Sequence, residues 1–164
     1  MSRSWKLMWL LNRVDPDFSM KTFNDRKKFQ KIVVLAQELD IPLGYGFGWY
    51  KHGPYSSSLA DDGFTIDQVP RDSWSEFINL ADMKEFESRA DSLEKLIERA
   101  VSEIQGLDET QILELLASLV FLARHAYPRL QKKEDAIEAL KAYKSFTPTQ
   151  MELAWEILKD ARLV

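Results

Sequence analysis

The segment of the chain best suited to binding chemistry is a turn at residues 51–58. Lys51 and His52 carry cationic or proton-exchanging side chains, Tyr55 follows, and Ser56 and Ser57 stand at the start of a predicted helix. A helix N-terminus presents free backbone N–H groups, which together with neighbouring cations attract phosphates and carboxylates. These five residues are therefore candidates for binding an anion or a partner. The alternative interpretation is that the serines only cap the helix and Lys51 points to water.

A second candidate is a run of basic residues earlier in the chain, between residues 21 and 31. Its members are Lys21, Arg26, Lys27, Lys28 and Lys31. One interpretation is the solvated face of a helix. The other is a local patch that docks a phosphate backbone or the acidic surface of a partner.

The basic run belongs to a wider division of charge along the chain, whose net charge is −4. Residues 1–55 hold nine Lys/Arg and five Asp/Glu, a net of +4, whereas residues 56–164 hold 13 and 21, a net of −8. The overall value argues against a protein that coats nucleic acid with its whole surface. The division leaves the N-terminal third as the candidate docking surface.

No arrangement of catalytic residues, metal ligands or cofactor-binding loops is recognisable. The chain has no cysteine and only two histidines, which excludes Cys-ligated zinc, iron–sulfur clusters and thiol nucleophiles. The glycines at 44, 46 and 48 alternate with aromatics and follow a predicted helix, so they lack the strand–loop–helix setting of a nucleotide-binding loop. We therefore assign no catalytic residue, no metal and no cofactor, and the sequence favours a non-enzymatic role.

The elements that position these residues are mostly helical. Apolar spacing predicts helices at 4–13 and 25–39, the second capped by Asn24, then a strand at 44–50 and a short helix that starts at Ser56 and ends at Gly63. Capping boxes predict later helix starts at Ser73–Glu76, Asp108–Gln111 and Thr147–Gln150. The fold class we predict is mainly α, a compact helical bundle with a short strand or β-hairpin in the N-terminal half, forming a single domain over residues 1–164.

A longer apolar pattern runs from residue 86 to residue 104. Its apolar residues alternate steps of four and three, as in a coiled-coil seam: Phe86, Ala90, Leu93, Ile97, Ala100 and Ile104. The seam offers a route to a homo-oligomer through the 86–104 helix. No apolar run approaches the roughly 18 residues of a membrane span, so we expect no membrane partner and a cytoplasmic location.

Several stretches resemble a known group of proteins. Residues 27–39, the segment Tyr50–Ser56 and residues 59–62 resemble the YwgA-like uncharacterised proteins of bacteria and archaea, and more distantly the Panacea domain of SocA-like antitoxins. Residues 113–119 and 147–158 are similar to later helices of the same group. The resemblance implies a helical fold that acts through protein contacts, and it carries over no catalytic residue.

Three hypotheses about function follow. The first is a non-enzymatic binding or regulatory module that acts through protein contacts and is antitoxin-like, with an unidentified protein partner. The second is an enzyme or binder of a phosphorylated or acidic small ligand at residues 51–58, with His52 as acid and base. The third is a winged-helix-like nucleic-acid binder that uses the basic segment 21–31. It ranks below protein binding because residues 57–62 carry two acids and no base.

Overall fold

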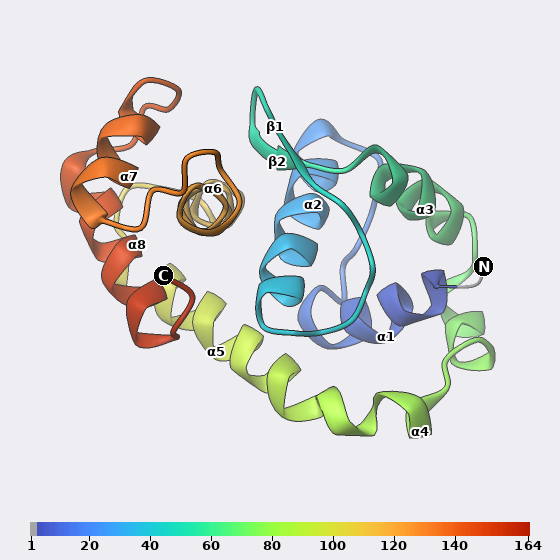
Figure 1. Cartoon of the computed structure of the whole chain (residues 1–164). Coiled ribbons are helices and arrows are strands. Elements are labelled where there is room, and N and C mark those ends of the chain that lie inside the picture. The colour runs from blue at the N-terminus through green and yellow to red at the C-terminus, as the bar shows by residue number, and fades with distance from the viewer. Residues whose placement is uncertain (1–2) are drawn as a thin grey trace.

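Two helices form the centre of the molecule, and the others are arranged around them. The computed structural model describes residues 3–164. The elements in chain order are α1 (Ser4–Val14), α2 (Phe23–Glu38), β1 (Gly48–Tyr50), β2 (Gly53–Tyr55), α3 (Ser57–Asp67), α4 (Leu80–Met83), α5 (Glu87–Glu103), α6 (Glu109–Arg124), α7 (Lys133–Lys141) and α8 (Pro148–Asp160). The central pair is α2 and α6, with α1 and α3 on one side and α7 and α8 on the other (Figure 1). The predicted fold class, a helical bundle with a hairpin in the N-terminal half, is confirmed.

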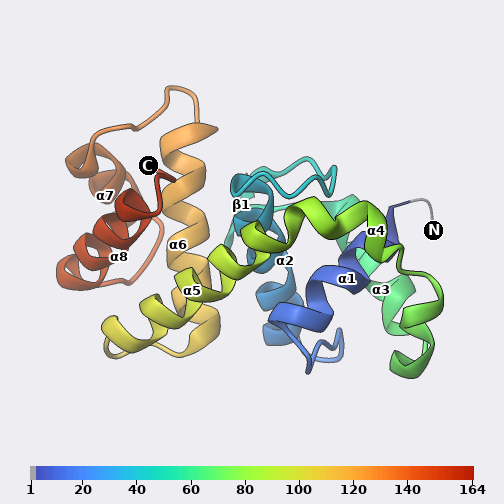
Figure 2. The same ribbon diagram turned by 90° about the horizontal axis from the view of Figure 1, so that it is seen from below.

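Burial follows from this arrangement. Helix α6 packs against α2, α5, α7, α8 and strand β2, and its residues from Ile112 to Ala123 are all buried. A helix that is covered on all sides is expected to be apolar all round, and this stretch is so except at Glu114 and Ser118. Helix α5 runs obliquely across the molecule and joins the two sides (Figure 2).

The seam predicted at residues 86–104 is covered within the chain itself. Its residues Ala90, Leu93, Ile97 and Ala100 are buried, and α5 packs against α1, α2, α6 and α8. The seam therefore contributes to the core of one molecule, and its apolar surface is not left open to a second copy.

Helix starts agree with the predicted caps at three of five positions, one of which is Ser56 at the start of α3. The capping boxes Asp108–Gln111 and Thr147–Gln150 open α6 and α8 as predicted. The cap of α2 is Thr22 rather than Asn24, because Thr22 and Asp25 form their own capping box. The helix predicted after Ser73 is wrong, since Arg71–Glu76 forms only a 3₁₀ helix.

The β-structure is shorter than predicted. The strand expected at 44–50 pairs only over Gly48–Tyr50, antiparallel to Gly53–Tyr55, with Trp49 opposite Pro54. The extended chain before it is held by Gln37, whose side chain bonds both the N–H and the carbonyl oxygen of Tyr45. Side-chain bonding thus replaces the partner strand that this segment lacks.

Helix α3 continues past the residue at which we expected it to end. Gly63 lies inside the helix, and a Cβ there would come 2.5 Å from the Phe29 ring and 2.9 Å from the Met20 methyl. Glycine is required at this position for close packing of α3 on α2, not for a left-handed helix end. The prediction that Gly63 closes the helix is therefore wrong. No helix within residues 3–164 is long and apolar enough to cross a bilayer.

Candidate functional site

An open cavity lies where the start of α2, the hairpin and α3 meet. Its volume is about 390 Å³, and its lining comes from residues 20–31, residues 50–55 and helix α3. From the two predicted groups it collects Arg26, Lys27, Lys31, Lys51, His52 and Tyr55. We call this cavity the aromatic groove, for the side chains at its rim. Two clusters that the sequence presents separately therefore form one site.

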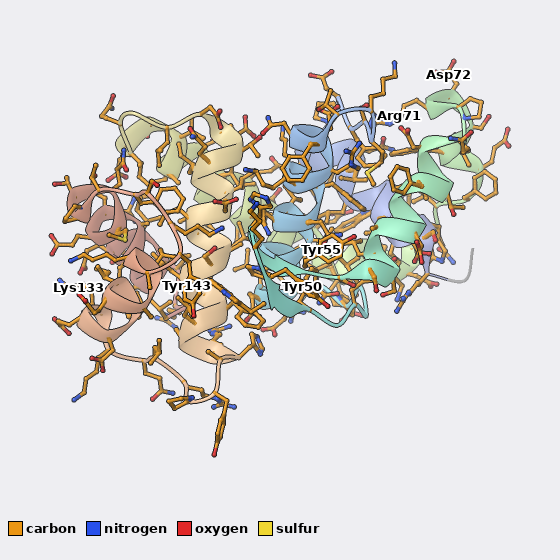
Figure 3. All side chains as sticks on the ribbon, turned by 90° about the horizontal axis from the view of Figure 1, so that it is seen from above. Tyr50, Tyr55, Arg71, Asp72, Lys133 and Tyr143 are labelled. Carbon is orange, nitrogen blue, oxygen red and sulfur yellow. The ribbon has the colours of Figure 1, made fainter. Side chains whose placement is uncertain are left out.

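Four exposed aromatic side chains surround the groove. Phe23, Tyr50, Tyr55 and Phe64 are between 38% and 59% exposed, although large apolar side chains are normally covered. The Tyr50 and Tyr55 rings lie side by side on the hairpin with centroids 5.3 Å apart (Figure 3). These side chains come from four elements, α2, β1, β2 and α3, so their convergence is a property of the fold. Phe23, Tyr50 and Phe64 were missed by the sequence analysis, because no local pattern shows which aromatics remain uncovered.

Two buried side chains of α2 hold the hairpin in place. Gln30 donates to the Ser56 carbonyl oxygen at 2.8 Å and accepts from the Ser56 N–H at 3.0 Å. The Lys31 ammonium group donates to the Pro54 carbonyl oxygen at 2.6 Å, and the whole residue is only 2% exposed. Gln30 and Lys31 therefore fix the hairpin side of the groove relative to α2.

The two serines of the predicted anion site are not available to bind an anion in the groove. Ser56 is buried, and its hydroxyl oxygen accepts from the Leu59 N–H as the cap of α3. Ser57 is exposed and is not part of the groove lining. The cationic residues Lys51 and His52 do line the groove, so the anion-attracting part of the predicted cluster lies beside the aromatics.

Most residues of the basic run bond to other parts of the molecule, and two of the five pair with carboxylates. Lys28 lies 3.3 Å from a carboxylate oxygen of Asp15 and 3.5 Å from one of Glu109. Arg26 donates to the carbonyl oxygens of Met20 and Lys21, while Lys21 itself is exposed. The run is therefore neither a uniformly solvated helix face nor a continuous track for a phosphate backbone.

Behind the groove lies a group of charged residues that we call the Glu114 cluster. It consists of Glu114, Lys27, Lys31, His52 and Lys144. Glu114, on α6, is 3.2 Å from the Lys27 amine, 3.4 Å from the Lys144 amine and 3.9 Å from the His52 ring nitrogen. Lys144 also donates to the Lys51 carbonyl oxygen at 2.9 Å, which ties the turn of the hairpin to the C-terminal part of the chain.

Burial changes the protonation of three members of this cluster. Desolvation lowers the pKa of Lys31 to about 7, although the negative charge of Glu114 opposes the change. Desolvation also lowers the pKa of Lys144 and the pKa of His52 from their ordinary values, again against the pull of Glu114. The His52 ring is therefore mostly neutral at pH 7, and Lys31 is divided between its charged and neutral forms.

The rest of the turn is shaped by its glycine. Gly53 has φ +90°, and a Cβ there would lie 2.6 Å from the Ser118 hydroxyl oxygen of α6. The turn therefore packs directly on α6, with a backbone conformation that residues other than glycine rarely adopt.

Comparisons with known proteins name no relative for this site. No family model, curated protein or solved structure matched the chain. Among the residues from 3 to 164, no group of three or more His, Cys, Asp or Glu is arranged to hold a metal ion.

Proposed function

We propose that the chain is a non-enzymatic binding module that recognises a segment of a partner protein in the aromatic groove. The observation that carries this proposal is the convergence of Phe23, Tyr50, Tyr55 and Phe64 around one cavity. Clustered exposed aromatics on a folded domain are typical of surfaces that bind other proteins. The segment we expect carries an apolar or aromatic anchor flanked by acidic residues, since the cations Arg26, Lys27 and Lys51 border the same cavity.

The distribution of charge favours a protein over nucleic acid as the partner. A nucleic-acid groove needs a row of free cations along the phosphate backbone. Here Lys27 and Lys28 lie beside carboxylates, Arg26 is bonded to backbone oxygens, and Lys31 is buried. The apolar rings are the larger free surface, so they supply most of the binding free energy in this proposal, and the cations select the partner.

The resemblance to antitoxins supports the same choice of partner. Proteins of that kind act by protein contact, and we propose an antitoxin-like or regulatory role on that basis. We propose a cytoplasmic location for this module, and its cysteine-free composition is consistent with a compartment in which disulfides are rare.

A peptide-display selection on the whole chain tests the proposal. We expect enriched peptides to share an apolar anchor next to Asp or Glu. Phe64→Ser and Tyr50→Ser should each weaken their binding at least about tenfold, as loss of a central aromatic contact does. Tyr127→Ser is the matched control, because Tyr127 is fully exposed and lies outside the groove.

Two outcomes would overturn the proposal. One is a selection without any shared motif. The other is a set of peptides that bind the Phe64 and Tyr50 variants as tightly as the unchanged chain. Enrichment of Lys- or Arg-rich peptides would contradict the expected charge of the partner.

A further inference from the structure

The Glu114 cluster contains more positive than negative charge. Three lysines, Lys27, Lys31 and Lys144, are grouped with a single carboxylate, and none of these four side chains is more than 16% exposed. Buried charge is costly unless an opposite charge is close. Glu114 can balance only one of the three ammonium groups, so the cluster keeps an excess of positive charge and can accommodate a further negative charge.

The unbalanced side of the cluster faces the aromatic groove. Lys27 and Lys31 line the groove directly, and so do Lys51 and His52 at the turn of the hairpin. Glu114 and Lys144 lie behind them and are not part of the lining. Lys51 makes no ion pair with any residue between 3 and 164. An anion that enters the groove therefore meets amines first and the carboxylate last.

We infer that the inner end of the aromatic groove is a carboxylate-binding subsite, in which Lys27 and Lys31 hold one carboxylate of the occupant beside its apolar anchor. The inference deepens the proposed function and rests on it for the natural occupant, an acidic segment of a partner protein. A carboxylate fits better than a phosphate dianion, because Lys27 already pairs with Glu114 and Lys31 already donates to the Pro54 carbonyl oxygen, so the charge and donors left over suit a single negative charge.

Binding at this subsite is coupled to a proton. The charged groups that act on Lys31 are Lys27 on its own helix, Glu114 on α6 and Lys144 ahead of α8, and His52 on the hairpin faces Glu114. Near pH 7, part of the population holds Lys31 as a neutral amine. A carboxylate beside it favours the ammonium form, so binding draws a proton from solution.

The test uses small probes that carry the same chemistry. The probe is 3-phenylpropionate, an aromatic ring joined to one carboxylate, and its uncharged counterpart is 3-phenylpropionamide. Binding to the whole chain is followed by NMR with ¹³C-labelled lysine, which reports the protonation of Lys31. We expect the carboxylate to bind about tenfold more tightly than the amide at pH 7. We also expect the carboxylate to bind the ammonium form of Lys31 about tenfold more tightly than the neutral amine form. Saturation with the carboxylate should then raise the pKa of Lys31 by about one unit.

Substitutions separate the subsite from general charge effects. Lys31→Met should abolish the preference for the carboxylate over the amide, and Lys27→Met should reduce it. The second variant keeps the test decisive if the first fails to fold. Lys28→Met is the matched control, because Lys28 is on the same helix and pairs with Asp15 and Glu109 outside the groove.

Each remaining outcome has a definite meaning. Equal affinity for the two probes, no binding of either, or an unchanged Lys31 pKa overturns the subsite. Tighter binding of phenyl phosphate than of the carboxylate also overturns it, in favour of a phosphate site. Selected peptides that lack Asp and Glu would leave the binding module standing without this subsite. Carboxylate binding with no selected peptide would remove only the protein partner.

Discussion

Lys31 makes the stability of this protein depend on pH in an unusual window. The native state releases the Lys31 proton near pH 7, whereas the unfolded chain holds it until about pH 10.5. Between these values the unfolded state binds more protons, so the free energy of unfolding rises with pH. From pH 7 to pH 9 this single group contributes a rise of about 2 kcal/mol, obtained from ~1.4 kcal/mol per pH unit after allowing for partial protonation at pH 7.

Other groups near Lys31 do not reverse this expectation. The pKa of Lys144 is also lowered by burial, so Lys144 adds a change of the same sign toward the upper end of the window. His52 titrates below its usual value of 6.5. Burial and the hydrogen bond to Asp62 raise the pKa of Tyr45, so its effect lies above pH 9. The rise between pH 7 and pH 9 therefore belongs to Lys31 with a smaller share from Lys144.

Urea unfolding followed by circular dichroism measures this rise directly. Lys31→Met should remove most of the dependence, and Lys144→Met should remove only the smaller part near pH 9. Lysine NMR of the unchanged chain gives the Lys31 pKa independently of any variant. A free energy of unfolding that stays level or falls from pH 7 to pH 9 would refute the reasoning. So would a Lys31→Met variant that keeps the full rise.

Three further substitutions probe the surroundings of the groove, the first two by urea unfolding and the third by hydrogen exchange. Glu114→Gln removes the one carboxylate among the buried lysines and should cost about 3–5 kcal/mol, whereas Glu109→Gln at an exposed pair should cost less than about 1 kcal/mol; similar losses would argue against a buried cluster. Gly63→Ala should destabilise by about 1–3 kcal/mol through overpacking against α2, while Gly46→Ala, with no atom within 4 Å of the new Cβ, should change stability by less than about 0.5 kcal/mol. Trp49→Leu removes stacking of the hairpin on α6 and should speed hydrogen exchange at hairpin amides; unchanged exchange would show that stacking does not hold the hairpin.

Most of the helical framework could be predicted because its signals are local. The capping boxes at Asp108 and Thr147 and the apolar spacing of residues 87–103 each depend on neighbours within one or two turns. The end of α3 could not be predicted in this way. Gly63 has the sequence appearance of a helix end, yet its role is set by Phe29 on another helix. Tertiary packing overrides local preference at such a position.

Individual residues of the candidate site could be predicted from the sequence, but their convergence in one cavity could not. The turn at residues 51–58 indicates Lys51, His52 and Tyr55 as site residues, and the basic run indicates Lys27 and Lys31. Their convergence depends on long-range contacts, chiefly the bond from Lys31 to the Pro54 carbonyl oxygen. No spacing along the chain reports such a contact. The other two members of the cluster, Glu114 and Lys144, could not be predicted from the sequence either. They lie far from the turn and the basic run along the chain, and only the fold brings them together.

Residues 1–55 are net positive and residues 56–164 are net negative, and ion pairs within the molecule join the two parts. Cations from residues 1–55 pair with carboxylates from residues 56–164 in the contacts Arg13–Asp91, Lys27–Glu114 and Lys28–Glu109. Internal pairing occupies four of the nine cations of residues 1–55, and of the five others only Arg26, Lys31 and Lys51 line the groove. Few free cations beside four exposed rings fit a partner that is anchored by apolar contact and selected by one or two carboxylates. For this reason we expect the affinity for the partner to fall only modestly with added salt, because apolar contacts are not screened and buried charges are screened weakly.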